Sequence, residues 1–213
     1  SDRLTRALKR GGAAGPSIAV RTASSIFMAS LLKDSELLSY LPKALIAYPR
    51  RLLVQQAADT LAEAGVDRRV VVLGAQAERV LAVATDLPPT VVNPDWPTGL
   101  GSSLRVGLQA LAGTPAQAVV VLLVDMPGVT GSAVRRIAGF AAPDALVLGG
   151  YGDRRGHPVL LGRDHWGAVA GSATGDRGAR DYLRAHAATV RVVQVGDVAD
   201  DFDIDTPEDN PHA

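Results

Sequence analysis

The chain has 213 residues, of which 47% are hydrophobic and 21% charged, and its 22 basic residues balance 22 acidic residues. This balance argues against a nucleic-acid-binding surface, which needs a basic excess, and the apolar content excludes intrinsic disorder. The chain has no cysteine, which excludes a disulfide framework, a thiolate nucleophile and a Cys-ligated zinc ion. Since no apolar run is long enough to span a bilayer, we expect a compact cytoplasmic protein that binds neither nucleic acid nor membrane.

From about residue 50 the chain alternates between two apolar patterns. Helical spacing predicts helices over 51–64, 75–84, 102–111, 131–140 and 177–186. Short apolar runs predict strands over 70–74, 90–93, 118–124, 145–148, 157–161 and 190–195. Strands alternating with helices of this length indicate right-handed βαβ units. The predicted fold class is therefore α/β, a three-layer αβα sandwich with a mostly parallel, Rossmann-like sheet.

The first 40 residues do not follow this alternation. Residues 1–33 contain six basic residues and one acidic residue, and the only run typical of a strand is Ser25-Ile26-Phe27-Met28-Ala29. A targeting peptide and an ordinary solvated extension are both open interpretations of this composition. We therefore divide the chain into an atypical N-terminal segment, 1–40, and one globular domain, 41–213.

Two groups of carboxylates stand where a cation site is expected, beyond the carboxyl ends of the strands. Asp125 directly follows the strand predicted to end at residue 124, and its carboxylate could hold Mg²⁺ against a phosphate. Asp203 and Asp205 lie in an acidic C-terminal segment, and neither is explained by the helix start predicted at 206–209. A metal site shared by Asp125 and Asp205 is one interpretation, and ordinary turn or cap residues are the other.

Lys43 is the only lysine beyond residue 33 in a chain that otherwise uses arginine for its basic residues. A compact ammonium is what a phosphate-contacting lysine supplies and a guanidinium does not. This lysine either has a functional role or has been retained by chance.

Two further loops carry candidate binding groups. Asn93 follows a predicted strand, and Gly101, Ser102 and Ser103 open the next helix, which is typical of an anion or base pocket but also of a well-capped loop. Arg155 and His157 lie among glycines at 152 and 156, where they could receive an anionic substrate or play a structural part.

Several of these motifs, in this order, resemble the nucleotidyltransferases of the molybdenum-cofactor type, most of all the cytidylyltransferase branch. The resemblance covers about residues 41 to 209. It rests on Pro42-Lys43-Ala44-Leu45, Asn93-Pro94-Asp95-Trp96 with 99–104, Val124-Asp125-Met126-Pro127, Gly156-His157-Pro158-Val159, Gly175-Asp176-Arg177-Gly178-Ala179-Arg180 and Asp203-Ile204-Asp205-Thr206-Pro207-Glu208-Asp209.

The resemblance implies a nucleotide-diphosphosugar-transferase-like fold and transfer of a nucleoside monophosphate, CMP from CTP, to a phosphorylated pterin-type acceptor with release of pyrophosphate. It implies that Lys43 contacts the NTP phosphates, that Asp125 and Asp205 hold Mg²⁺, and that Asn93 with Gly101, Ser102 and Ser103 holds the nucleotide. His157, with Arg155, would face the acceptor. A molybdoenzyme or its chaperone is a further implied partner.

One departure from the family pattern concerns the N-terminal segment. The family opens with a strand running into a glycine-rich phosphate loop about ten residues before the lysine, whereas residues 26–41 contain no glycine. A partial match, Ala13-Ala14-Gly15-Pro16-Ser17, lies further upstream. Guanylyl transfer, a sugar-phosphate acceptor and a non-catalytic nucleotide or cofactor binder therefore remain alternative functions.

Overall fold

The computed structural model describes residues 43–213 except 49–50, 67, 206–208, 210 and 212–213. The strand predicted at 25–29, the partial glycine motif and most of the helix start predicted at 206–209 lie outside the described residues. The helices are α2 (Leu53–Glu63), α3 (Ala77–Val83), α4 (Leu100–Ala112), α5 (Gly131–Ala138), α6 (Trp166–Ser172) and α7 (Arg180–Ala185). The strands are β1 (Ala47–Tyr48), β2 (Arg51–Leu52), β3 (Val71–Leu73), β4 (Thr90–Val92), β5 (Ala118–Val121), β6 (Leu146–Tyr151), β7 (Arg154–Gly162) and β8 (Arg191–Gln194). Short 3₁₀ helices are η2 (Lys43–Leu45), η3 (Trp96–Thr98), η4 (Arg163–His165) and η5 (Gly175–Arg177).

The larger sheet has four strands in the order β5-β7-β6-β8. Strands β5, β6 and β8 run in one direction, and β7 is antiparallel to both of its neighbours. Strands β3 and β4 form a separate parallel pair, and β1 and β2 form a short antiparallel hairpin. The mostly parallel sheet predicted from the sequence is confirmed, with β7 as the reversed strand.

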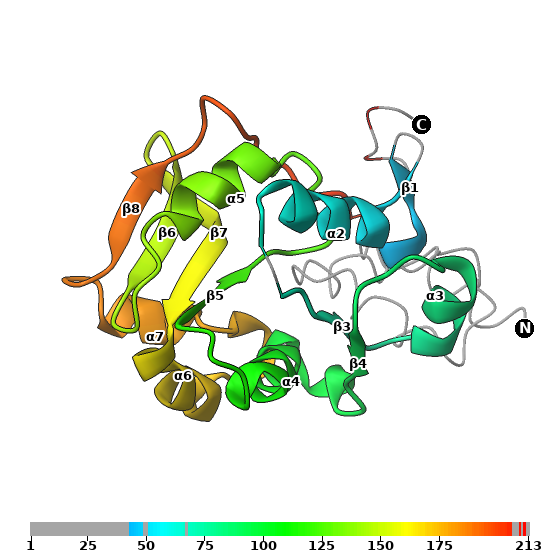
Figure 1. Cartoon of the computed structure of the whole chain (residues 1–213), viewed down its shortest axis with the longest axis horizontal. Helices are drawn as coiled ribbons and strands as arrows, with labels where there is room; N and C mark the ends of the chain where they lie inside the picture. Colours follow the sequence, from blue (N-terminus) through cyan, green and yellow to red (C-terminus); the bar gives the residue numbers. More distant parts are fainter. Residues whose placement is uncertain (1–42, 49–50, 67, 206–208, 210, 212–213) are drawn as a thin grey trace, which may run out of the picture.

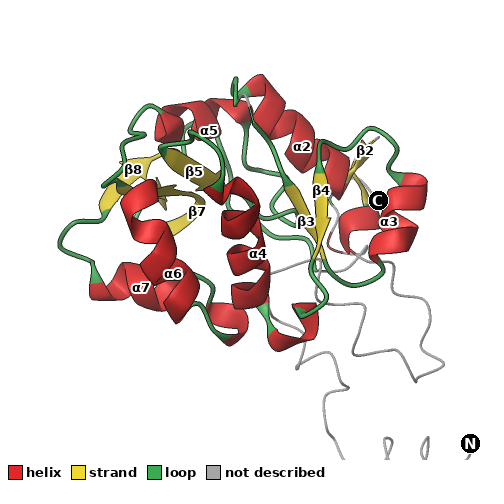
Figure 2. Ribbon diagram, turned by 60° about the horizontal axis from the view of Figure 1, so that its bottom comes forward, coloured by secondary structure: helices red, strands yellow, loops and turns green. Residues whose placement is uncertain are grey.

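Helices cover both faces of these sheets, so the three-layer arrangement is also confirmed. Figures 1 and 2 show α2 and α5 on one face, and α4, α6 and α7 on the other. Two apolar clusters fill the layers of the larger sheet. One packs Val134 and Ile137 of α5 against Leu160 of β7, and the other packs Leu108 of α4 against Leu161 of β7. Successive side chains of β7 therefore point to opposite faces of the sheet and pack into two different apolar clusters.

Every helix and strand predicted between residues 50 and 195 overlaps an observed one, but some bounds differ. β6 and β7 extend to meet in a hairpin through residues 152–153, because Gly152 adopts a positive φ of 63° that a tight turn favours. Helix α6 was not predicted, since its short sequence contains Gly167 and Gly171, which lower helix propensity. Its fully buried Val169 packs into the α4 side of the core, so tertiary contact stabilises it. In the part of the chain that the structure describes, no helix is long and apolar enough to span a membrane.

The central position of β7 makes Leu160 a sensitive test of this packing. Leu160 is fully buried, whereas Leu81 on α3 is 40% exposed. We expect Leu160→Ala to lower the free energy of unfolding by about 2–5 kcal/mol, because it leaves a cavity between two layers. The control Leu81→Ala should change it by less than about 0.5 kcal/mol. Denaturant unfolding measures both, and equal losses would contradict this assignment of the core.

Candidate functional site

A buried lysine joins two carboxylates from distant parts of the chain. The Nζ atom of Lys43 donates to Oδ2 of Asp125 at 2.9 Å and to Oδ1 of Asp205 at 2.5 Å. The Lys43 side chain is 1% exposed and that of Asp125 is fully buried, while Asp205 is 36% exposed. The structure therefore brings together the three residues that the sequence proposed for phosphate and metal binding.

Packing around the site explains why these three side chains meet. Ala44 and Leu45, next to Lys43, belong to an apolar cluster with Leu73 at the end of β3, and Val124 packs against this cluster. At the C-terminal side, Ile204 is fully buried against Ile46 and Leu53.

The backbone adds a direct link, because the N–H of Ile204 donates to the carbonyl of Asp125 at 2.8 Å. Burial of one apolar residue thus positions Asp203 and Asp205, its two neighbours in sequence.

The electrostatics of the site favour a cation. Burial lowers the pKa of Lys43, but attraction to Asp125 and hydrogen bonds to both carboxylates outweigh this, so the pKa is raised and the ammonium persists. Burial raises the pKa of the Asp125 carboxyl, and the Lys43 ammonium is the main group that counteracts this increase. The charge of Asp203 also acts on Asp125. One ammonium therefore faces several carboxylates, which leaves the site net negative.

Asp125 has an oxygen that is available to a further ligand. Its Oδ1 atom is buried and has no hydrogen-bond partner among the described residues, and such an orphaned acceptor is costly unless something binds it. The described residues contain no group of three or more His, Cys, Asp or Glu residues able to enclose a metal ion by themselves. Two carboxylates fit Mg²⁺, which proteins usually hold through one or two carboxylates, with substrate phosphates and water completing its ligands.

The Asn93 loop forms a second polar cluster, following β4. The fully buried Asn93 side chain donates from Nδ2 to Oγ of Ser102 at 2.8 Å and to Oγ of Ser103 at 2.9 Å. Its Oδ1 accepts from the N–H of Asp95 at 3.0 Å. These side chains are engaged with one another, so their observed contacts hold the loop onto the start of α4. Their role in nucleotide binding stays a prediction.

The glycines at the start of α4 have a packing reason. A Cβ at Gly99 would lie 2.3 Å from the backbone of Gly175, and one at Gly101 would lie 2.7 Å from the backbone of Ala173. Gly99 also has a φ of 109°, which disfavours other residues. Close approach of the 173–175 segment therefore accounts for both glycines without a ligand.

Arg155 and His157 lie on β7, at the edge of the sheet where β5 ends. Val121 pairs with Val159, so continuing this register brings His157 level with Leu123, close in sequence to Asp125. Arg155, His157 and Arg180 line one cavity. The acceptor-side residues thus stand on the same sheet edge as the carboxylates, and whether they bind an acceptor stays a prediction.

Residues 36–190 match the MobA-like NTP transferase domain. The chain belongs to this family. Its domain is a nucleotidyltransferase domain, and the predicted relation to molybdenum-cofactor nucleotidyltransferases is confirmed at this level.

Several known proteins are similar to this chain in sequence or in fold. The chain is 38% identical over 176 residues to the nicotine blue oxidoreductase of Paenarthrobacter nicotinovorans, covering 78% of this chain and 85% of that protein. Among solved structures, the Rv0371c protein of Mycobacterium tuberculosis H37Rv in complex with manganese has a TM-score of 0.64 and 30% identity, covering 76% of this chain and 86% of that one. A nucleotidyl transferase from Methanothermobacter thermautotrophicus has a TM-score of 0.69 at 20% identity, covering 79% and 82%.

Two charged residues near the candidate site were not chosen from the sequence. Arg180 at the start of α7 acts on His157 through its charge, and Asp203 acts on Asp125. Arg180 belongs to the motif at 175–180 and Asp203 to the motif at 203–209, both of which were noted in the sequence. Only the packing of α7 and of the C-terminal segment shows that these two residues come close to His157 and Asp125.

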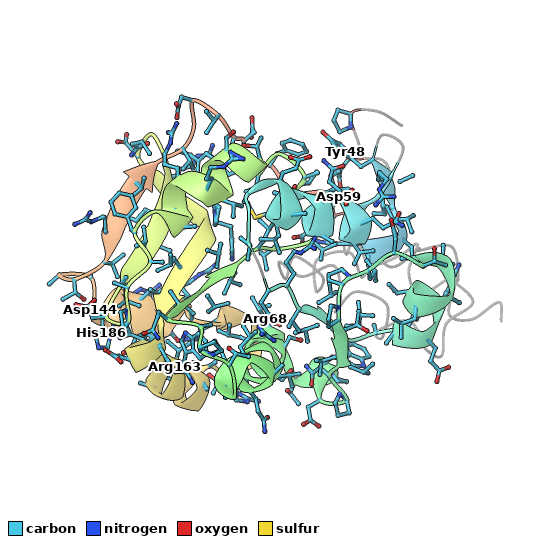
Figure 3. The ribbon with its side chains drawn as sticks, in the orientation of Figure 1. Tyr48, Asp59, Arg68, Asp144, Arg163 and His186 are labelled. Carbon is cyan, nitrogen blue, oxygen red and sulfur yellow. The ribbon has the colours of Figure 1, made fainter. Side chains whose placement is uncertain are left out.

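A histidine cluster lies elsewhere in the molecule. His165 contacts the Tyr182 hydroxyl at 2.8 Å and the Asp144 carbonyl at 3.0 Å, and Tyr182 stacks on His186. Figure 3 shows Asp144 and His186 at the α7 end of the molecule, on the opposite side from Tyr48 and Asp59. These histidines tie η4 to α7 and do not belong to the Lys43 site.

The state of His157 can be tested through pH. Burial, and secondarily the charge of Arg180, lower the pKa of His157 from 6.5 to about 4. The folded protein therefore keeps His157 neutral while the unfolded chain binds a proton, so this residue makes stability fall as the pH drops from about 6.5 toward about 4. We expect His157→Gln to remove this contribution to the loss of stability at low pH.

Denaturant unfolding of both proteins across this interval measures the effect, and the comparison at about pH 8, where histidine is neutral in both states, is the control. Identical pH profiles would contradict the assigned burial of His157.

Proposed function

We propose that the protein transfers CMP from CTP to a phosphorylated pterin-type acceptor and releases pyrophosphate, with Mg²⁺ as its metal ion. The observation that carries this proposal is the buried Lys43 held between Asp125 and Asp205 beside an orphaned carboxylate oxygen. A cationic group and a cation-binding pair together match the charges of a nucleoside triphosphate. Residues 41–213 form the catalytic domain in this proposal, and residues 1–40 are a separate segment.

The reaction needs positioning and charge neutralisation more than covalent catalysis. An acceptor phosphate oxygen attacks the α-phosphorus, the bond from phosphorus to the bridging oxygen of pyrophosphate breaks, and pyrophosphate leaves with the electron pair. Lys43 would turn from the carboxylates to the triphosphate oxygens. Asp125 and Asp205 would hold Mg²⁺, which when bound neutralises charge on the phosphates.

The remaining proposed residues orient the two substrates. Asn93, Gly101, Ser102 and Ser103 would hold the nucleotide at the N-terminus of α4, where backbone N–H groups favour anions. Arg155 would attract the acceptor phosphate, while neutral His157 would offer a hydrogen bond without charge. A molybdoenzyme or its chaperone would receive the product.

The comparisons support parts of this proposal. The manganese complex of the mycobacterial protein supports divalent metal binding in a relative with 30% identity. CTP is preferred over GTP only through the sequence resemblance, so guanylyl transfer and a sugar-phosphate acceptor remain alternatives.

A pyrophosphate-release assay with CTP or GTP, Mg²⁺ and a phosphorylated pterin tests the proposal. We expect turnover with CTP and, for Asp125→Asn, a loss of about 100-fold or more, because this change removes a charge that holds the metal ion. Full activity of Asp125→Asn would contradict the metal assignment. Binding of CTP without any pyrophosphate release would instead favour a non-catalytic nucleotide binder.

Lys43 should compete with the metal ion, since its ammonium contacts both carboxylates that would bind it. We expect Lys43→Met to bind Mn²⁺ without nucleotide about tenfold more tightly than the wild type, while losing transferase activity. Calorimetric titration with Mn²⁺ measures the affinity.

Arg51→Met is the matched control. Arg51 also bridges two carboxylates, those of Asp59 and Asp86, but all three side chains are more than 40% exposed. Its removal should leave Mn²⁺ affinity unchanged. Equal affinity of wild type and Lys43→Met would contradict the competition.

A second candidate function follows from the relative with 38% identity, which is named an oxidoreductase acting on nicotine blue. In this alternative the protein would act on nicotine blue, as the name of that relative states. A change in the absorbance of nicotine blue on incubation with the protein, without pyrophosphate release from CTP or GTP, would favour it over nucleotidyl transfer.

A further inference from the structure

Two neighbouring arginines at the start of β7 lie on opposite faces of the larger sheet. Arg154 pairs with Tyr151 of β6, whose side chain belongs to the apolar cluster beside α5. Arg155 pairs with Gly150, and directly paired residues share a face of the sheet. Alternation along β6 puts Gly150 on the same face as Leu148, which packs against the apolar cluster beside α4, α6 and α7. Arg155 therefore projects from the face that these three helices cover.

The two arginines also differ in their partners. The guanidinium of Arg154 donates to Oδ1 of Asp201 at 2.7 Å. Arg155 is exposed and forms no hydrogen bond or ion pair with any residue that the structure describes. The charge of Arg154 is thus neutralised within the molecule, and the charge of Arg155 is not.

The motif at 175–180 brings a second such pair of arginines to the same face. Its end is held against α4, since a Cβ at Gly178 would lie 3.2 Å from the Leu100 side chain. Arg177 donates to Oδ2 of Asp181 at 2.9 Å. Arg180 is exposed, and within the described part of the chain it has neither a carboxylate nor a hydrogen-bond partner. One arginine of this motif is therefore paired and the other is free for a ligand.

His157 shows that the two unpaired arginines serve one place. It lies two residues beyond Arg155 on β7, and the charge of Arg180 acts on its ring. All three residues line one cavity. Among the described residues of that lining, Asp176 supplies the only carboxylate, and it forms no ion pair with either arginine. Two guanidinium groups beside a neutral ring carry positive charge that an anion would neutralise.

We propose that Arg155 and Arg180 together bind the phosphate group of the acceptor, and that Arg180 selects a phosphorylated acceptor over one without phosphate. The identity of the anion rests on the proposed function, whereas its place rests on the contacts above. A guanidinium binds phosphate oxygens through parallel N–H···O hydrogen bonds. Arginines on β7 and α7 would hold the phosphate from two sides and keep one of its oxygens oriented for attack on the α-phosphorus.

The packing of the motif also fits this role. Because Gly178 contacts Leu100 at the start of α4, Arg180 lies between the helix start proposed to bind the nucleotide and the strand that carries Arg155. An anion held there would be close to both proposed substrate sites.

Titration of the full chain with inorganic phosphate, without nucleotide, tests the anion site by NMR. The ring signals of His157, identified by their loss in His157→Gln, should shift saturably, because a bound anion offsets the Arg180 charge that acts on this ring. We expect Arg155→Met and Arg180→Met each to weaken phosphate binding about tenfold or more, as the loss of a charge-assisted hydrogen bond does.

The paired arginines of the same two segments provide matched controls. Arg154→Met and Arg177→Met should leave phosphate affinity unchanged, because their guanidinium groups are already bound to carboxylates. All four arginines are exposed, so none of these substitutions should disturb the core. Absence of a saturable shift at His157, or an equal loss of affinity in all four variants, would overturn the proposal.

Transfer kinetics test the assignment to the acceptor. For Arg180→Met, we expect KM for the phosphorylated pterin to rise about tenfold while KM for CTP stays unchanged. An equal rise of both KM values would overturn this assignment. If the wild type transfers no nucleotide at all, the proposed function fails, and the phosphate titration still decides whether the two arginines bind an anion.

Discussion

The contact of one buried ammonium with two carboxylates is the interaction on which this structure depends. Lys43, Asp125 and Asp205 come from the beginning, middle and end of the described chain. Removing one partner of a buried ion pair costs about 3–5 kcal/mol, because the other charge is left without compensation. The backbone bond from Ile204 to Asp125 adds a fixed geometry to this electrostatic link. The candidate site therefore takes its three charged residues from segments that are far apart in the sequence and that core packing brings together.

The charges around this contact match the proposed chemistry. The carboxylate side is net negative, and the Oδ1 atom of Asp125 has no hydrogen-bond partner among the described residues, which suits a cation. The β7 side carries Arg155, with Arg180 nearby on α7, while His157 stays neutral because of burial and the Arg180 charge. A metal-bound triphosphate and an anionic acceptor would thus meet opposite local charges along one sheet edge. Membership of the MobA-like NTP transferase family is consistent with this arrangement.

Local sequence patterns predicted most of the fold, and their failures have identifiable causes. The 3.6-residue period of α2 and α4 and the apolar runs of β3 and β5 are local properties, so their positions could be predicted. The reversed direction of β7 depends on the hairpin at Gly152 and on pairing with β5, whose partner residues are distant in sequence. For the same reason, α6 escaped prediction, since burial of Val169 and not helix propensity stabilises it. At the candidate site, Lys43, Asp125 and Asp205 could be chosen from the sequence, while the contributions of Asp203 and Arg180 required the packed structure.

The equal numbers of acidic and basic residues excluded a uniformly basic binding protein. The alternation of helix and strand patterns determined the fold class, and the carboxylates that follow the strands identified the candidate site residues. These conclusions follow from the sequence because periodicity and residue type act over a few positions. Tertiary structure alone decided that Lys43 bridges both aspartates and that the Asn93 cluster is internally bonded. Each of these depends on distances between residues far apart in the chain, which are set by core packing and backbone pairing.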